Sequence, residues 1–476
     1  MKDFTSFQQQ RKLDDVKHTI RQLEALIEVI AFSLVYYFIY RTFYVGSVFL
    51  PYLTYGKYVL MLVYGIISLI LFGYCGSFQF GHLKPFDVMV SQSISIVLVN
   101  IITYFQLCLM ANDMIQVYPL LILCILEGIV ALICTLLFSA LYHRLYIPKN
   151  MLMIFGNKDS VTLKLKMDTR ADKYHIKKML SVEAGYENIC REISQYDAVV
   201  LNDIPAQIRN DILKFCYQNG VRTYLTPKLT DIMVQGSSDM NLFDTPLLLV
   251  RGRGLRPVQA FVKRTLDVLL CSVAMIPAAP VMLITALAIK IEDGGSVFFR
   301  QKRVTKDGRE FDILKFRSMI ENAEKHGEVI PARGGDPRIT RVGRILRASR
   351  LDELPQLLNI IKGDMSIVGP RPERVEHVKR YTAEIPEFAF RTKVKSGLTG
   401  YAQIYGKYNT SPYDKLRLDL MYIENYSLLL DIKLVLMTLQ ILFRRESTEG
   451  FEKVDELRKQ KDKIITELDS PADNSK

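Results

Sequence analysis

The sequence predicts a membrane α-helical bundle of four spans, then a cytoplasmic α/β Rossmann-like domain, and then an α+β domain with a re-entrant membrane helix. Three observations support this fold class. Residues 26–145 hold four long apolar stretches, and residues 146–250 alternate short apolar runs with helical patterns. A further apolar stretch is interrupted by Pro277 and Pro280. A chain of 476 residues is long enough for about three domains.

Four apolar stretches predict the transmembrane domain, which we place at residues 26–145. Each is close to the roughly 20 residues that a helix needs to cross a bilayer. They lie near 27–45, 58–76, 88–111 and 117–142. Glu127, in the fourth stretch, is the one acid expected at membrane depth. We assign it to helix packing or protonation rather than to a functional role, because no basic partner is evident at a matching depth.

Basic residues predict the orientation of these spans. The charged segment 1–25 precedes the first span, Arg144 and Lys149 follow the fourth, and the two outer loops hold few basic residues. The positive-inside rule therefore places both ends of the bundle in the cytoplasm, together with everything after residue 145. The N-terminal segment is not followed by a signal-peptide pattern.

The alternation of short apolar runs and helical patterns in residues 146–250 predicts a small doubly wound α/β domain. Its expected strands include MLMIFG (151–156), YDAVVLND (196–203) and VRTYLTP (221–227). After the first of these the chain reads GNKDS, with one glycine where a dinucleotide-binding turn needs three. A structural or oligomerising module is therefore favoured over nucleotide binding, and a homodimer is expected.

The charge balance favours anionic partners. The chain carries 62 Lys and Arg against 50 Asp and Glu, a formal net charge of +12, which suits nucleic acid, anionic lipid or phosphorylated small molecules. The surplus is concentrated between Arg300 and Arg350, where 14 basic residues face 7 acidic ones, so an anion is expected to bind there. The 7 cysteines form no CxxC pair, which argues against a disulfide framework or a zinc site.

Residues 251–445 form the third predicted domain, and they begin with an apolar stretch long enough for a fifth span. Pro277 and Pro280 lie at its centre, and each removes a backbone donor from a helix. A fifth full span would also place the basic region beyond it outside the cell. A helix that enters the membrane and turns back at the prolines is therefore favoured, and a kinked true span is the alternative.

Two adjacent acids stand in the segment RLDELPQLLNIIKG (350–363). Proline is tolerated in the first turn of a helix, so Pro355 predicts a helix start just before it, and Gly363 predicts its end. Asp352 and Glu353 would then lie at a helix N-terminus, which favours negative charge. Ordinary N-capping is the alternative, but one cap needs only one acid.

Basic residues surround this acid pair in the sequence. Arg347 and Arg371 flank it, and the expected strand 311–319 carries Lys315 and Arg317. The combination fits a carboxylate nucleophile, Asp352, beside a carboxylate that binds a divalent cation. Basic side chains would stabilise the charge on a transferring phosphoryl group.

The third domain resembles the bacterial polyprenyl-phosphate hexose-1-phosphate transferases. The motifs that carry this resemblance are KRxxD, FFRQKR, LKFRSM, RASRLDELPQLLNIIKGDMSIVGPRP and KSGLTGYAQIYG, in order over about 255–445. The four spans and the α/β domain are similar to the long form of the family. The resemblance implies a multi-pass protein of the bacterial inner (cytoplasmic) membrane, with its catalytic domain on the cytoplasmic face.

The resemblance also implies a reaction and its participants. UDP-hexose and undecaprenyl phosphate would give undecaprenyl-diphospho-hexose and UMP with Mg²⁺, the first membrane step of exopolysaccharide, capsule or O-antigen biosynthesis. Glucose and galactose are the expected hexoses. The partners are therefore the two substrates and membrane lipid, with no nucleic acid.

The family's functional residues carry over onto matching positions of this sequence. Asp352 would be the nucleophile on the sugar-bearing phosphate, and Glu353 would bind the metal ion. Pro277 and Pro280 match the break in the family's re-entrant helix. Ser396 and Tyr401 depart from the family's frequent proline and tryptophan, which leaves the identity of the hexose open. The residues assigned to substrate binding are Lys315, Arg317, Arg347, Arg371, Arg391 and Asp419.

Two other functions remain open. A non-catalytic scaffold for polysaccharide assembly would need only the basic surface, and a glycosyltransferase that moves the sugar alone would release UDP instead of UMP. Residues 427–445 predict a membrane-surface helix. The charged segment 446–476 predicts a solvated helix that ends in a disordered tail.

Overall fold

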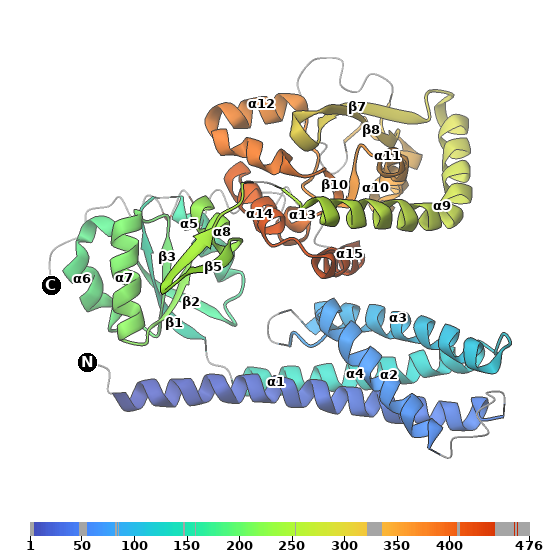
Figure 1. Cartoon of the computed structure of the whole chain (residues 1–476), viewed down its shortest axis with the longest axis horizontal. Helices are drawn as coiled ribbons and strands as arrows, with labels where there is room; N and C mark the ends of the chain where they lie inside the picture. Colours follow the sequence, from blue (N-terminus) through green and yellow to red (C-terminus); the bar gives the residue numbers. More distant parts are fainter. Residues whose placement is uncertain are drawn as a thin grey trace. The chain divides into compact units, whose positions relative to one another are not determined.

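The computed structural model describes residues 4–46, 55–80, 83, 85–145, 148–157, 159–252, 254–320, 336–406, 410–442, 461 and 464. The chain divides into two compact units at Thr226 and Pro227. Figure 1 shows the helices of the bundle, the α/β sheet and the mixed third region. The tail expected at 446–476 lies outside the described residues except for two positions.

Four long helices form the bundle. They are α1 (Phe4–Ile39), α2 (Gly56–Cys75), α3 (Pro85–Ala111) and α4 (Tyr118–Leu145), and a short π-helical turn, Tyr40–Tyr44, extends α1. Aromatic side chains fill part of the core, where the rings of Tyr36 and Tyr64 stack with centroids 4.2 Å apart. Leu62 and Leu137, by contrast, are more than half exposed, as expected of side chains that face lipid.

The interior of the bundle also holds carboxyl groups. Glu127 is buried and accepts hydrogen bonds from the Tyr64 hydroxyl and from Asn100 Nδ2, the latter at 2.7 Å. The sequence predicted Glu127 as the one acid at membrane depth, but two further acids lie within a candidate span. The first candidate span runs from Thr19 to Tyr44, so it includes the buried residues Glu24 and Glu28.

The α/β domain has the expected parallel sheet. Its strands β1 (Lys149–Phe155), β2 (Tyr174–Ser181), β3 (Ala198–Asn202) and β4 (Arg222–Leu225) pair in the order β2-β1-β3-β4, all parallel. The helices α5 (Ser160–Asp168), α6 (Tyr186–Ile193) and α7 (Ala206–Gln218) connect them, with a 3-10 turn at Val182–Ala184. The central strands β1 and β3 are almost fully buried, which is why apolar runs predicted them.

The second compact unit begins with α8 (Leu229–Gln235) and a hairpin of β5 (Ser238–Leu242) and β6 (Thr245–Leu249). The sequence-based boundary at 250 places these elements in the α/β domain. In the structure, Leu229 and Ile232 of α8 are buried in one core with Leu416 and Leu420 of α14 (Pro412–Glu424). This apolar packing groups α8 with the unit that follows it.

The rest of this unit alternates helices with short strands. An antiparallel hairpin of β7 (Phe298–Val304) and β8 (Glu310–Phe316) encloses the turn Lys306–Gly308. A small parallel pair joins β9 (Ser366–Val368) and β10 (Gly397–Thr399). The remaining elements are α10 (Arg341–Ser349), a 3-10 turn at Leu351–Glu353, α11 (Gln356–Lys362), α12 (Val375–Glu384), a 3-10 segment at Pro386–Lys393, α13 (Tyr401–Tyr405) and α15 (Leu428–Leu442).

The helix α9 (Pro257–Asp293) contains both prolines of the expected re-entrant segment. Figure 1 shows a sharp bend within it, and prolines inside a helix are a known cause of such kinks. Among the described residues, five helices, including α9, are long and apolar enough to cross a membrane. Length and composition therefore do not separate a re-entrant α9 from a spanning one.

Candidate functional site

Polar groups anchor the first arm of α9 to the rest of its unit. Lys263 forms a buried ion pair with Asp431 of α15 at 2.5 Å. Arg264 donates to the carbonyl oxygens of Ile360 and Ile361 at 2.5 and 2.7 Å, at the C-terminal end of α11. The KRxxD motif therefore joins α9 to the helices around the acid pair, a structural role that the sequence did not reveal.

The acid pair lies on a sharply turned piece of backbone. Arg350 ends α10 and adopts a left-handed conformation with φ = 58°, and the 3-10 turn that holds Asp352 and Glu353 follows at once. Pro355 is the N-cap residue of α11, and Gly363 ends that helix with φ = 101°. The helix end predicted from Gly363 is confirmed, but the helix begins at Gln356, after Pro355 rather than before it, and the acids lie in a separate turn before α11. Neither N-cap residue makes a side-chain cap hydrogen bond.

The strand β8 is fixed to α11 beneath this turn. Asn359 is buried, and its amide donates to the Asp312 carbonyl at 2.9 Å and accepts from the Leu314 backbone N–H at 2.9 Å. Phe311 and Ile313 of the strand are buried with Ile360 of the helix. This packing places Lys315, two residues after Ile313 in β8, beside the acid pair. No pattern in the sequence marks Asn359, because its two partners are distant in the chain.

Glu353 is held between two cations. Its Oε1 lies 2.6 Å from Lys315 Nζ and 3.4 Å from an Arg371 guanidinium nitrogen. Burial alone would raise the pKa of Glu353, but the charges of Arg371 and Lys315 outweigh it and hold that pKa at about 2. Burial lowers the pKa of Lys315 despite the neighbouring carboxylate. Glu353 is therefore an ionised carboxylate at neutral pH.

Asp352 differs from its neighbour in partners and in pKa. Within the described residues, its carboxyl group has no hydrogen bond or ion pair. Burial raises its pKa, while the charges of Lys315, Arg350 and Arg347 counteract that effect and Glu353 adds to it. The raised pKa marks a group in a partly desolvated position, as expected of a reactive carboxylate.

A network of buried charged residues holds the backbone of Arg371 in place. Arg391 donates to the Arg371 carbonyl oxygen at 2.8 Å, and its guanidinium lies 2.8 Å from Asp419 and 3.7 Å from Glu373. Lys415 lies 3.2 Å from Glu373. Burial raises the pKa of Asp419 to about 6 in spite of Arg391. Two of the predicted substrate-binding residues, Arg391 and Asp419, therefore fix the backbone of Arg371 in this structure.

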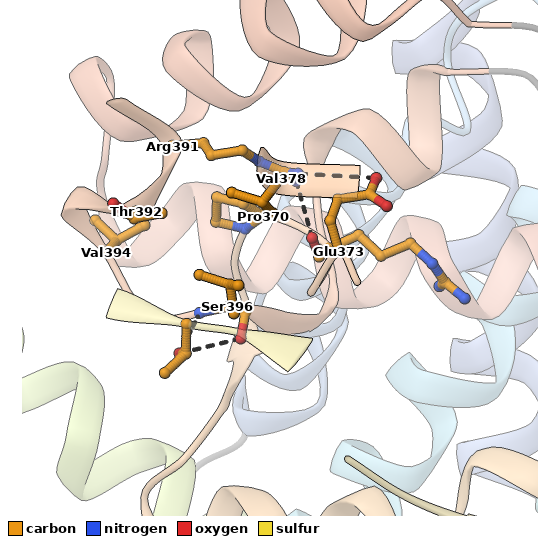
Figure 2. Close-up of a pocket in the computed structure, with 10 residues that line it drawn as sticks. Pro370, Glu373, Val378, Arg391, Thr392, Val394 and Ser396 are labelled. Carbon is orange, nitrogen blue, oxygen red and sulfur yellow. Dashed lines mark hydrogen bonds and ion pairs between the residues drawn. The ribbon is translucent and has the colours of Figure 1, made fainter. Parts of the chain in front are cut away.

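A small pocket adjoins this network. Figure 2 shows Arg391 and Glu373 pointing toward one another on its wall, with Ser396 on the other side. Ser396 is buried, and its hydroxyl lies 3.1 Å from the Thr305 hydroxyl. Ser396 therefore contributes to the pocket lining, whereas Tyr401 packs its ring 4.6 Å from that of Tyr405 on the same helix. The other lining residues are Val304, Pro370, Arg371, Val378, Thr392 and Val394.

The other two predicted basic residues, Arg347 and Arg317, differ in their relation to the acid pair. Arg347, on α10, acts on the pKa of Asp352. Arg317 follows the end of β8, is buried, and forms an ion pair with Asp293 at the end of α9. The structure thus brings Lys315, Arg347 and Arg371 close to the acid pair. Arg317 instead forms its ion pair with α9.

The donor set fits a magnesium ion in part. Within the part of the chain that the structure describes, no group of three or more His, Cys, Asp or Glu residues could hold a metal ion. Magnesium, however, is commonly bound by one or two carboxylates together with substrate phosphates. Asp352 and Glu353 supply two adjacent carboxyl groups, and no cation of the described residues lies within 4 Å of Asp352.

Comparison with known proteins points to one family. The family model described as bacterial sugar transferase matches residues 258–445. The chain is 44% identical over 210 residues to a UDP-glucose:undecaprenyl-phosphate glucose-1-phosphate transferase of Caulobacter vibrioides, covering 43% of this chain and 78% of that protein. It is 44% identical over 189 residues to a UDP-N-acetylgalactosamine-undecaprenyl-phosphate N-acetylgalactosaminephosphotransferase of Aeromonas hydrophila, covering 39% of this chain and 44% of that protein.

A shorter relative matches over most of its length. The exopolysaccharide production protein ExoY of Sinorhizobium fredii is 39% identical over 199 residues, which is 39% of this chain and 87% of that protein. The matched region spans less than half of the Aeromonas protein. The similarity to these three proteins thus covers about two fifths of the chain, and the family match includes the acid pair, Lys315, Arg371 and Arg391.

Proposed function

Because this chain belongs to the bacterial sugar transferase family, we propose that it transfers hexose 1-phosphate from UDP-hexose to undecaprenyl phosphate and releases UMP. One observation carries this proposal. Among the residues that the structure describes, Asp352 has no hydrogen-bond or ion-pair partner, yet it lies beside Glu353, whose carboxylate is held by Lys315 and Arg371. A free carboxylate next to fixed cations can attack a phosphorus atom whose negative charge those cations stabilise.

The reaction proceeds in two displacements at the same phosphorus atom. Asp352 attacks the sugar-bearing phosphate of UDP-hexose, forming an aspartyl sugar phosphate while the bond to UMP breaks. A phosphate oxygen of undecaprenyl phosphate then attacks this phosphorus, and the aspartate carboxylate is released. Lys315 and Arg371 stabilise the charge that builds on the phosphoryl oxygens.

Magnesium is the proposed cofactor. When bound, it would neutralise charge on the donor phosphates and act as a Lewis acid. Glu353 would hold it, together with phosphate oxygens of the donor. Lys315 and Arg371 orient the Glu353 carboxylate, and Arg391 fixes the backbone of Arg371 at 2.8 Å.

We also propose four spans, with α9 as a re-entrant helix of the inner membrane. The positions of Lys290, Arg300 and Lys302 beyond the apolar stretch support this arrangement, because a fifth span would carry them across the membrane. The catalytic unit would then face the cytoplasm, where UDP-hexose is available, with α15 at the membrane surface. A homodimer remains a prediction that chemical cross-linking of the full chain in membranes can test.

One assay tests the reaction. Membranes that contain the chain are incubated with undecaprenyl phosphate, Mg²⁺ and either UDP-glucose, UDP-galactose or a UDP-N-acetylhexosamine, and the nucleotide product is identified. The proposal expects UMP with at least one donor, and no turnover above background with Asp352→Asn. Release of UDP, or full activity of Asp352→Asn, would contradict it. Absence of turnover with every donor would favour a scaffold.

A further inference from the structure

Basic side chains from several elements converge at the C-terminal end of α11, away from the acid pair. Gly363 ends the helix with φ = 101°, and a Cβ atom placed on it would lie 3.3 Å from Arg264 Nη2 and 3.7 Å from Lys395 Nζ. These two nitrogens, from α9 and from the segment before β10, therefore adjoin one small space that a side chain at position 363 would fill.

The turn between β7 and β8 brings further basic residues to this end of α11. Thr305 donates to the Asp364 carbonyl oxygen at 2.9 Å and accepts from the Ser396 backbone N–H at 3.2 Å. The turn is thereby fixed against both segments, which places Lys306 and Arg309 near Lys395. Burial and the charges of Arg264, Arg309 and Lys306 lower the pKa of Lys395, although Asp267 opposes this.

The nearby carboxylates are already engaged. Asp364 pairs with Arg309 at 3.0 Å and with Lys362 at 3.3 Å, and Asp267 accepts a hydrogen bond from the Ile367 backbone N–H at 3.1 Å. Asp307 lies 3.9 Å from Lys306. Among the described residues, Lys395 has no hydrogen bond or ion pair, and Arg264 donates only to neutral carbonyl groups.

Arg264 and Lys395 form no ion pair with a described residue and repel each other. Asp267 offsets this repulsion only in part, and an anion between the two cations would reduce it further. Phosphate groups are typical ligands of such paired Arg and Lys side chains. The surroundings indicate the source of the phosphate. Phe261 and Leu269, three residues before and five residues after Arg264 on α9, are 72% and 57% exposed, so this arm of α9 carries an apolar surface that suits lipid chains.

We propose that Arg264 and Lys395 bind the phosphate of an anionic membrane phospholipid at the C-terminal end of α11. This site is distinct from the acid pair, because α11 has seven residues and separates the two by about 10 Å. The acceptor phosphate has to reach the phosphorus attached to Asp352, which this distance does not allow. The bound phospholipid would fix the depth of α9 in the bilayer surface.

Titration of the full-length chain in detergent with phosphatidylglycerol or phosphatidylcholine, followed by native mass spectrometry, tests the proposal. We expect phosphatidylglycerol to bind more tightly than phosphatidylcholine. Lys395→Gln should weaken phosphatidylglycerol binding about tenfold, the loss expected for one charge-assisted contact. Lys395→Arg should retain most of it. Lys379→Gln, which removes an exposed charge on α12, serves as the matched control and should bind as the unmodified chain does.

Several results would overturn the proposal. Unchanged phosphatidylglycerol binding by Lys395→Gln would exclude the site, as would equal binding of the two lipids. Displacement of phosphatidylglycerol by UMP or inorganic phosphate would assign the site to a soluble anion, and displacement by stoichiometric undecaprenyl phosphate would assign it to the acceptor. If Lys395→Gln fails to fold, phosphatidylglycerol binding by the unmodified chain is measured at increasing salt concentration. The affinity of an ionic site must decrease with salt, so a constant affinity would overturn the proposal. These measurements do not depend on catalytic activity.

Discussion

The Lys315 ammonium group lies 2.6 Å from the Glu353 carboxylate, while the adjacent Asp352 forms no hydrogen bond or ion pair with any described residue. Two neighbouring carboxyl groups thus have different electrostatic surroundings. The cations hold the pKa of Glu353 at about 2, whereas burial raises the pKa of Asp352 above its usual value. Two neighbouring carboxyl groups whose pKa values are shifted in opposite directions can take different roles in a reaction. In the proposed reaction, one is a permanently charged ligand and the other a nucleophile.

The ionisation of Asp352 should limit the reaction at low pH. Because its pKa is raised and the attacking form is the carboxylate, kcat/KM should fall with decreasing pH at values above the usual aspartate pKa. Arg347→Gln removes a charge that lowers this pKa, so the acidic limb should move to higher pH. Arg344→Gln, an exposed change on the same helix, is the control. An identical shift in both variants would contradict the assignment.

Lys315 should act through Glu353 as well as on the substrate. Lys315→Met removes the closest cation from Glu353 and leaves Arg371, so the pKa of Glu353 should rise from about 2 toward its usual value. We expect kcat/KM to fall by about 100-fold or more, as found when one charged group is removed from a phosphoryl-transfer site. Measurement of UMP release at saturating and limiting donor concentrations separates the effects on kcat and KM. An unchanged kcat/KM would contradict the role of Lys315.

The folded state should lose a contribution of Glu353 in acid. The pKa of Glu353 is about 2 in the folded chain and 4.5 in its reference state, so its contribution to stability is present above pH 4.5 and is lost as the pH falls toward 2. The thermal midpoint of the unmodified chain should therefore decrease over this window more than that of Glu353→Gln. Thermal unfolding in detergent at several pH values measures this. Parallel decreases in both proteins would refute the linkage.

Asp419 should confer a second pH dependence, acting through Arg391. Protonation of Asp419, whose pKa is raised to about 6, removes the charge that holds Arg391 against the Arg371 carbonyl. Donor binding should therefore weaken below about pH 6, with KM rising more than kcat falls. Asp419→Asn should show the weak binding at every pH and lose this transition. Initial rates over a pH series at several donor concentrations provide the test, and persistence of the transition in Asp419→Asn would exclude this mechanism.

The sequence was sufficient for features encoded locally. Runs of buried apolar residues identify β1 and β3, and Gly363 marks the end of α11 because its φ of 101° favours glycine. Pro355 indicated the helix start. It did not indicate the separate 3-10 turn of the acid pair, which depends on the left-handed conformation of Arg350.

Features that depend on distant partners could not be predicted. Lys315 and Arg317 lie two residues apart on one expected strand, and both were predicted to bind substrate. Arg317 instead pairs with Asp293, which only the packing of α9 brings near. Glu373 likewise becomes part of the network through Arg391 and Lys415, which are distant in sequence. Contacts between residues that are distant in the sequence produce no periodic pattern from which they could be predicted.

The two prolines should determine how α9 lies in the membrane. Pro277 and Pro280 each remove one backbone donor, and replacing both with alanine restores a continuous ladder of hydrogen bonds. The variant should favour a straight helix that crosses the bilayer. A single cysteine introduced at the exposed position Ser296, near the end of α9, reports the change in a background without the 7 native cysteines. It should be labelled from the cytoplasmic side in the parent, and more from the outer side after the double replacement. Outer labelling already in the parent would show that α9 spans the membrane.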